Sequence, residues 1–472
     1  MRIGAPDPSL TPAAGMVAVT ELVERLDVIG RLDAVIGPIK HRRRGHTGGQ
    51  LLVGIAAAQL AGEDFLVGLD RQRADTAGQQ LAPVPDLAAT TAAGLARRLS
   101  SGQWAAVETG LGDTATAALA MLPTQRAAAL CAQVTIDLDT TDVEVYGRRK
   151  HGIAFNHQGQ RVGRPHVATW ADTATVLAAD LLAGNEDPRR DAAELLRRAL
   201  AGLPTAARAG RIRLRADAGY FAGQLARAAL FADIEFAIGA RRIAPLWRLL
   251  DGIAETDWTD ALDMPAAQVA VADYCPHWWP AATRLLIGRV RFDVDRGAVS
   301  ADPRARRRRT LHPDQRTLPL AELADLDAVY GYSFIVTNLE VSTSEAAAQV
   351  EHWYRHRTQV ENVFRDAKHG AALRHLPSGH LDVNRAWMWG ALLAASLAGW
   401  LHQLTATPAP NGGLLGHGRR DGQAMIATLR HRLIRVPARL VHHAGALILR
   451  LPPGQTLLAE ILARIRALAA TS

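Results

Sequence analysis

The stretch Val134-Thr135-Ile136-Asp137-Leu138-Asp139 alternates apolar and polar residues. An alternation with a period of two is typical of a β-strand that buries one face. On such a strand the two acids point to one side and the apolar side chains to the other. The segment therefore predicts the first strand of a sheet, in a domain that we place from residue 129 onward.

The chain after this strand continues as alternating strands and helices. Strands are predicted at Pro165–Trp170, Ala174–Leu182, Arg211–Ala216 and Ile234–Gly239, and helices at Asp191–Leu203 and Phe221–Ala232. The order is strand, strand, strand, helix, strand, helix, strand. It predicts an α/β domain with one mixed sheet and helices on its faces.

The remaining chain differs in character from this domain. Apolar residues before residue 129 recur at helical spacing, for example over Val19–Val35, whereas residues 243 to 328 contain prolines and the pair Trp278-Trp279. A long helix is predicted at Ser344–Lys368 and an apolar one at Ala386–Leu404. The predicted segments are a tail (1–16), an all-helical domain (17–128), the first part of the core (129–242), a β-rich insertion (243–328), the second part of the core (329–405), a glycine-rich connector (406–423) and a C-terminal strand and helix (424–472).

Composition restricts the class of protein. Of 472 residues, 48% are hydrophobic and 21% charged, which favours folded cores over disorder. The net charge of +8 favours an anionic partner, most commonly nucleic acid. Two cysteines are too few for a disulfide framework and fit a reducing cytoplasm. The longest apolar stretch, Ala386–Leu401, is short for a membrane span and is expected to be a buried helix.

A basic segment, Lys40–His46, lies between two of the predicted N-terminal helices. Its cations Arg42, Arg43 and Arg44 could contact DNA phosphates. A solvated loop on a helical cap explains the same residues equally well, and this segment alone does not distinguish the two interpretations.

Four polar residues of the predicted helix Ser344–Lys368 are spaced by three, four and seven positions: Tyr354, Arg357, Glu361 and Lys368. At about 100° per residue they fall within roughly 60° around the helix axis. A carboxylate between two cations suits a metal site that also holds phosphates. The alternative is an ordinary salt-bridged surface face.

The pattern Tyr354-x2-Arg357-x3-Glu361-x6-Lys368 matches the signature of DDE transposases from insertion sequences. Lys368 is one of only three lysines, so composition does not explain its place in the pattern. Asp139-Thr140-Thr141 resembles the first motif of that family, and Asp217-Ala218-Gly219 resembles its second. Ala183-Gly184-Asn185 is similar to the short turn that the family has after its third strand. The likeness is strongest for group 1 DDE transposases.

The resemblance implies a ribonuclease-H-like core in which Asp139, Asp217 and Glu361 converge as catalytic, metal-binding residues. Three carboxylates offset the charge of two Mg²⁺ ions, for which Mn²⁺ can substitute. Tyr354, Arg357 and Lys368 would then contact DNA or phosphate. The implied partners are double-stranded DNA, as element inverted repeats and as target, and a second copy of the chain in the DNA complex.

Asp137 and Asp139 point to the same side of one strand, so geometry alone does not choose between them as the first acid. We choose Asp139 because it stands at the end of the strand, where DNA can reach it. It also directly precedes Thr140-Thr141, as the catalytic acid does in the family. Asp137 would then be a supporting partner one pleat deeper.

Other functions fit less well. A tyrosine recombinase needs a nucleophilic tyrosine downstream of an arginine motif such as His352-x2-Arg355, but Tyr354 is the last tyrosine. A serine recombinase would need an N-terminal catalytic serine among arginines, and the first 130 residues offer only Ser9, Ser100 and Ser101. A P-loop ATPase would need Gly-x4-Gly-Lys-Ser/Thr, which is absent. A repurposed DNA-binding protein and a metal-dependent nuclease remain alternatives.

Overall fold

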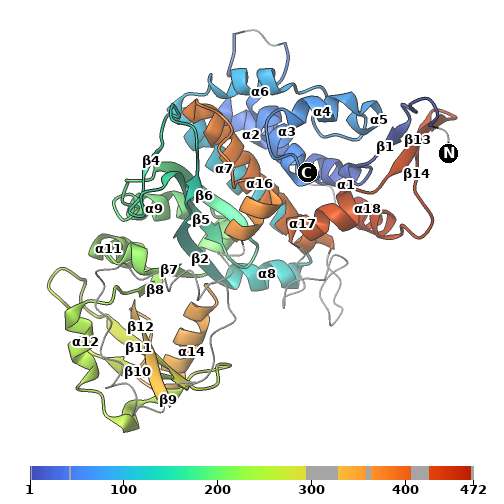
Figure 1. Ribbon diagram of the computed structural model, residues 1–472. Helices are drawn as coiled ribbons and strands as arrows, with labels where there is room; N and C mark the ends of the chain where they lie inside the picture. Colours follow the sequence, from blue (N-terminus) through green and yellow to red (C-terminus); the bar gives the residue numbers. More distant parts are fainter. Residues whose placement is uncertain (2, 42–43, 294–327, 358–362, 406–424, 469–472) are drawn as a thin grey trace. The chain divides into compact units, whose positions relative to one another are not determined.

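The structure is a computed structural model and describes all residues except 2, 42–43, 294–327, 358–362, 406–424 and 469–472 (Figure 1). The chain forms two compact units. The first unit comprises residues 1–236 and 357–472, and the second comprises residues 237–356. Each unit is described by itself.

The first unit contains a mixed sheet, as the sequence predicts. Strand β2 (Gln133–Thr140) pairs in parallel with β7 (Arg211–Ala216) and antiparallel with β5 (Arg161–Trp170). The order is β3-β5-β2-β7-β8, and β4 and β6 also pair with β5. The bounds of these other strands are β3 Val143–Glu144, β4 Ala154–Phe155, β6 Thr175–Ala183 and β8 Glu235–Gly239.

The turn after β6 depends on a close approach of two backbone segments. A Cβ atom on Gly184 would lie 2.5 Å from the carbonyl oxygen of Ala154 in β4. Any other residue at position 184 would therefore push β4 away from β5. Gly184 of the Gly-Asn pair that marks the end of a strand in the sequence is thus a packing requirement in the fold.

Helices surround this sheet in the first unit (Figure 1). The predicted helical segment Val19–Val35 is two helices, because Asp27 adopts a left-handed backbone with φ of 46°. Helix α7 contacts α9 and β6, and α2 contacts α7. The helices are α1 Met16–Arg25, α2 Val28–Ile36, α3 Gly48–Ala61, α4 Gly68–Ala74, α5 Thr76–Gln79, α6 Ala89–Ala96, α7 Ser101–Ala120, α8 Thr124–Ala132, α9 Ala192–Gly202, α10 Thr205–Arg208 and α11 Gly223–Phe231.

Helix α16 (Leu381–Thr405) covers the predicted apolar stretch and is buried along most of its length. It contacts α3 and β6, and the Ser396 hydroxyl accepts a hydrogen bond from the amide of Val176 at 3.1 Å. This confirms the expectation of a buried helix. Within the described ranges, no helix is both long and apolar enough to cross a membrane.

The C-terminal part of the first unit adds a small sheet that the sequence only partly predicts. The strand predicted at Ala444–Leu451 is observed at β14 (Ala446–Arg450), and it pairs with a neighbouring strand, β13, that was not predicted. The sheet order is β1-β13-β14. The remaining bounds are β1 Leu10–Thr11, β13 Ala438–His443, α17 Ile426–Leu429 and α18 Leu457–Ala467.

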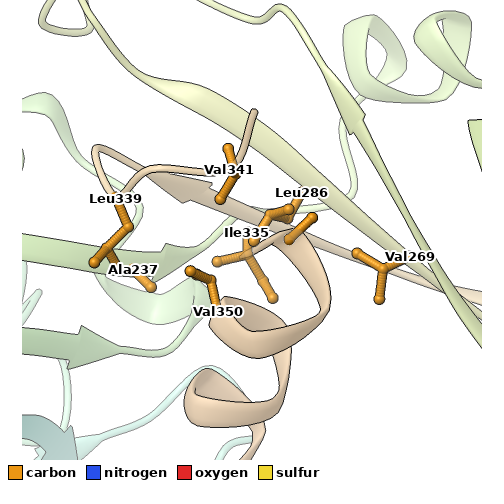
Figure 2. Close-up of a cluster of buried hydrophobic side chains, with 8 residues drawn as sticks. Ala237, Val269, Leu286, Ile335, Leu339, Val341 and Val350 are labelled. Carbon is orange, nitrogen blue, oxygen red and sulfur yellow. The ribbon is translucent and has the colours of Figure 1, made fainter. Parts of the chain in front are cut away.

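The second unit is an antiparallel sheet with one long helix against it. Its strands run in the order β8-β12-β11-β10-β9, and helix α14 (Ser344–Arg355) contacts β9, β10 and β11. Figure 2 shows the core between them, in which Val350 of the helix lies beside Leu286 and Ile335 of the sheet. The other bounds are α12 Ala244–Leu250, β9 Thr259–Asp260, β10 Ala267–Ala272, β11 Arg284–Asp293 and β12 Ala328–Thr337.

A buried carboxylate connects the N-terminal helices to the sheet of the first unit. Glu108 of α7 accepts hydrogen bonds from the Arg198 guanidinium at 2.7 Å and from the amide of Ala179 at 3.1 Å. Arg198 also pairs with Asp180. Burial raises the pKa of Glu108 from 4.5 to about 7, although Arg198 and the Ala179 amide oppose this effect.

We predict that this carboxyl makes the stability of the protein depend on pH. The folded chain holds a proton on Glu108 between the two pKa values, where the unfolded chain has released it. The contribution of Glu108 to stability is therefore fully present below pH 4.5 and is lost as the pH rises to about 7, by roughly 1.4 kcal/mol per pH unit. Glu108→Gln removes this dependence and keeps an acceptor for Ala179. Thermal unfolding between about pH 5 and about pH 8 measures the pH dependence of stability. Identical pH profiles for the variant and the wild type would contradict the prediction.

Candidate active site

Two acids that the sequence singled out lie at the ends of adjacent parallel strands. Leu138 of β2 is in register with Ala216 of β7, and the next residues along the two strands are Asp139 and Asp217. Because the strands are parallel, both carboxylates lie at the same edge of the sheet, one strand spacing apart.

Asp139 is mostly buried and has a cation beside it. Its Oδ1 atom accepts a hydrogen bond from the amide of Thr140 at 2.7 Å, and its Oδ2 lies 3.3 Å from Nη1 of Arg357. The Asp139 side chain is 13% exposed. One oxygen is thus held by the backbone, and the other faces positive charge.

Asp217 is positioned by the turn that follows β7. Its Oδ1 accepts a hydrogen bond from the amide of Gly219 at 2.8 Å, which caps the short helical turn Ala218–Tyr220. A Cβ atom on Gly219 would lie only 2.8 Å from the same carboxylate oxygen. The small residue after Asp217 therefore keeps the carboxylate in this orientation.

A buried aromatic pair lies close to both acids. The rings of Tyr220 and His166 are 5.6 Å apart and both side chains are buried. Burial raises the pKa of the Tyr220 phenol well above 10, and the carboxylates of Asp139 and Asp217 raise it further. Burial also lowers the pKa of His166 to about 3. At neutral pH both groups are uncharged, so they add no charge to the acidic edge.

Lys368 lies on a turn beside the first acid motif. It belongs to a π-helical turn, Asp366–Gly370, and its Nζ donates a hydrogen bond to the carbonyl oxygen of Asp142 at 2.8 Å. Burial lowers the pKa of Lys368, whereas the carboxylates of Asp142 and Asp139 oppose this. The amine thus lies in the field of both carboxylates.

The prediction of one continuous helix over Ser344–Lys368 is wrong at residues 356–357, which form a turn, whereas residues 363–365 are helical again. Helix α14 ends at Arg355, where the His356 ring lies 2.7 Å from the carbonyl oxygen of His352 and caps the last turn. The chain then passes from the second unit to the first. The spacing of a regular helix therefore does not relate Tyr354 to Lys368.

The other predicted site residues have different positions. Tyr354 is on α14 in the second unit and packs against that unit's core. Arg44 is exposed, whereas Arg42, Arg43 and Glu361 lie outside the described residues. Sequence reasoning missed Asp142, which pairs with Arg164 at 2.7 Å. Its position three residues after Asp139 was the only signal that could have indicated it.

The donor atoms of the acidic edge are carboxylate oxygens, the ligand type that Mg²⁺ prefers. Within the ranges that the structure describes, no group of three or more His, Cys, Asp or Glu side chains is placed to hold a metal ion. Asp139 and Asp217 supply two acids, and the third expected acid, Glu361, is in the segment 358–362 that is not described.

Comparison of the sequence with protein-family models gives a match to "Transposase DDE domain group 1" over residues 7–297 and 314–470. The chain belongs to the group 1 DDE-domain transposase family. A comparison with curated proteins finds no match.

Among solved structures, this transposase is similar to a piggyBac transposase synaptic complex with hairpin DNA, determined by cryo-electron microscopy. The sequence identity is 9%, and the alignment covers 88% of this chain and 78% of the other. The TM-score is 0.41.

The other acid of the transposase's first strand, Asp137, has both oxygens occupied. Arg215 of β7 donates from Nε to its Oδ1 at 2.7 Å and from Nη2 to its Oδ2 at 2.9 Å. Both side chains are buried. Burial raises the pKa of Asp137, and Arg215 opposes this effect. Asp137 therefore joins β2 to β7 within the sheet and has no open oxygen facing a substrate.

We predict that this ion pair is required for folding. Arg215→Met leaves the Asp137 carboxyl buried without its partner and should lower the free energy of unfolding by about 3–5 kcal/mol. The double variant Asp137→Leu/Arg215→Met should recover most of this loss, because it buries no unpaired charge. Urea unfolding monitored by circular dichroism measures both. A single variant as stable as wild type would contradict the prediction.

Proposed function

We propose that this transposase binds the inverted-repeat ends of a mobile element, cuts the phosphodiester bonds there and joins the 3′-hydroxyl ends to target DNA. The observation that carries the proposal is the pair of carboxylates, Asp139 and Asp217, at adjacent strand ends with Arg357 beside them. Family membership supports the same reaction class.

The proposed roles follow the charge of each group. Asp139, Asp217 and Glu361 hold two Mg²⁺ or Mn²⁺ ions, which when bound activate the attacking oxygen and stabilise the leaving one. Arg357 and Lys368 supply positive charge toward the phosphate of the cleaved bond. Tyr354 completes the proposed DNA contacts through its phenol. The Tyr220 and His166 pair is buried and stays neutral, so it adds no charge beside Asp139 and Asp217.

Two further features belong to the proposal. In this proposal the mixed sheet of the first unit is the ribonuclease-H-like core, which the antiparallel order β6-β5-β2 and the parallel pair β2-β7 support. The helical segment 17–128 binds the inverted repeat, with Arg42, Arg43 and Arg44 on its basic loop. Two copies of the chain act together, one on each element end.

We predict that Asp139→Asn and Asp217→Asn each abolish cleavage of end DNA and leave its binding within a few-fold. Each substitution keeps the side-chain volume but removes a negative charge needed for metal binding. Glu194→Gln is the control, because it removes one exposed carboxylate from the same unit. Single-turnover cleavage and a gel-shift assay, on duplexes that tile the DNA flanking the gene, measure the two effects. Near-normal cleavage by either variant would contradict the assignment.

The same assay separates the alternatives. A protein that binds the duplexes without cutting them is a repurposed DNA-binding protein. A protein that cuts them but forms no joint with an added plasmid is a nuclease. Products in which the 3′ ends are covalently joined to the plasmid support transposition.

We also predict that cleavage and joining stop in excess chelator and return with Mg²⁺ or Mn²⁺. Ca²⁺ should support binding without cleavage, because it takes the same oxygen ligands with longer, less regular geometry. End-labelled DNA separated on a denaturing gel reports cleavage. Full activity in excess chelator would contradict the assignment of a carboxylate metal site.

A further inference from the structure

The loop between β3 and β5 combines positive charge with exposed aromatic side chains. From Val145 to Arg161 the sequence has three arginines, one lysine, two histidines and no acid. We call residues 145–161 the β3–β5 loop. None of the roles proposed above involves this loop. The loop belongs to the first unit, which also contains Asp139 and Asp217.

The loop lies beyond the end of β2 that carries Asp139. Val167 of β5 is opposite Asp139, and Arg161 begins the same strand six residues earlier. At about 3.4 Å per residue this distance along β5 is roughly 20 Å. Because successive base pairs are about 3.4 Å apart, a duplex at Asp139 would reach the loop within about six base pairs.

Asp142 ties the loop to the first acid motif. Its Oδ2 accepts a hydrogen bond from the side chain of Asn156 at 2.8 Å, and its backbone carbonyl accepts one from Lys368. Burial raises the pKa of Asp142, but hydrogen bonds from Arg164 and Asn156 outweigh this effect and hold the pKa below 3.8. The carboxylate is therefore charged at neutral pH, and it binds Asn156 of the loop and Arg164 of β5.

The loop backbone is fixed by cations that point inward. Arg161 donates to the carbonyl oxygens of Gly147 at 2.6 Å and Arg148 at 3.0 Å. Lys150 donates to the carbonyl oxygen of Leu376, and the amide of His151 donates to Gly379 at 3.0 Å. A loop already held in one conformation loses little entropy when it binds a partner.

Other side chains of the loop point outward. Tyr146 is 87% exposed and Phe155 is 61% exposed, which is unusual for large aromatic residues. Arg148 and Arg149 are also exposed. Among the described residues, neither arginine side chain has a hydrogen bond or ion pair. The structure thus presents two cations and two aromatic rings on a fixed backbone.

We infer that the β3–β5 loop binds the element-end duplex close to the cleaved bond, with Arg148 and Arg149 on phosphates and Tyr146 and Phe155 against sugars or bases. This inference rests on the proposed function. Two phosphate-binding cations on a fixed loop would hold the duplex in register with the acidic edge. Exposed aromatic rings next to arginines also occur on surfaces that bind single-stranded nucleic acid, where the rings stack on bases.

Charge favours DNA over the other macromolecules that such a surface could bind. The loop has four Arg and Lys side chains and no acid, which suits the phosphate backbone of a duplex. An acidic protein is the alternative partner. The test would favour it if the loop variant kept its affinity for DNA.

The test compares Arg148→Ala/Arg149→Ala with Arg197→Ala/Arg208→Ala, which removes the same charge from exposed sites elsewhere in the first unit. Arg208 precedes β7 and lies at the end of that strand opposite Asp217. The probes are the duplexes that tile the DNA flanking the gene and a random-sequence duplex of equal length. Binding is measured over a series of salt concentrations.

The loop variant should bind end DNA about tenfold more weakly, and the slope of log affinity against log salt should fall by roughly two units. Phosphate-ethylation interference should disappear for phosphates within one helical turn of the cleaved bond. Tyr146→Ala should weaken binding of end DNA without changing the salt slope, because it removes no charge. The Arg197/Arg208 variant should match wild type in all three measurements.

A loop variant that matches the Arg197/Arg208 variant in affinity, salt slope and interference pattern overturns the inference. If wild type cuts and joins end DNA in that case, only the inference about the loop fails. If wild type neither binds nor cuts any duplex, the proposed function fails as well. Circular dichroism confirms that the variants are folded, which the exposed positions of Arg148 and Arg149 favour.

Discussion

The candidate site depends on the register of two parallel strands, β2 and β7. The bidentate pair of Asp137 and Arg215 links them inside the sheet, where a shift of one residue would bury both charges without partners. With this register fixed, the next residues at the strand ends are Asp139 and Asp217. The buried ion pair thus determines which two acids lie side by side, although neither of its members faces the substrate.

Cations lie next to the carboxylates at the strand ends that carry Asp139 and Asp217. Asp139 has Arg357 beside it, Asp142 has Arg164 and Lys368, and the buried Tyr220 and His166 are neutral. Positive charge therefore lies beside Asp139 and Asp142, and the buried Tyr220 and His166 pair adds no charge. Such an arrangement allows a site to attract an anionic backbone while its carboxylates remain charged. The inward cations of the β3–β5 loop extend the same arrangement along β5.

The two compact units have different kinds of core. The first buries the apolar helix α16 and carries Asp139 and Asp217, whereas the second packs α14 on an antiparallel sheet through residues such as Val350. Helix α14 ends at Arg355, and Arg357 already belongs to the first unit. Tyr354 and Arg357, which the sequence pattern relates by helical spacing, therefore belong to different units.

The sequence by itself determined the strands around Asp139 and Asp217, because alternation with a period of two and the Gly184 turn are local properties. It also determined the buried character of α16. It did not determine strand β13, the partner of Asp137 or the role of Asp142, since each depends on residues far away in the chain. The helical spacing of the sequence also predicted a helix that continues past Arg355, where α14 ends. The chain enters the first unit at Arg357, and a local pattern does not report that change. Local spacing indicated which residues carry the chemistry, whereas only strand pairing and burial decided which of them lie together.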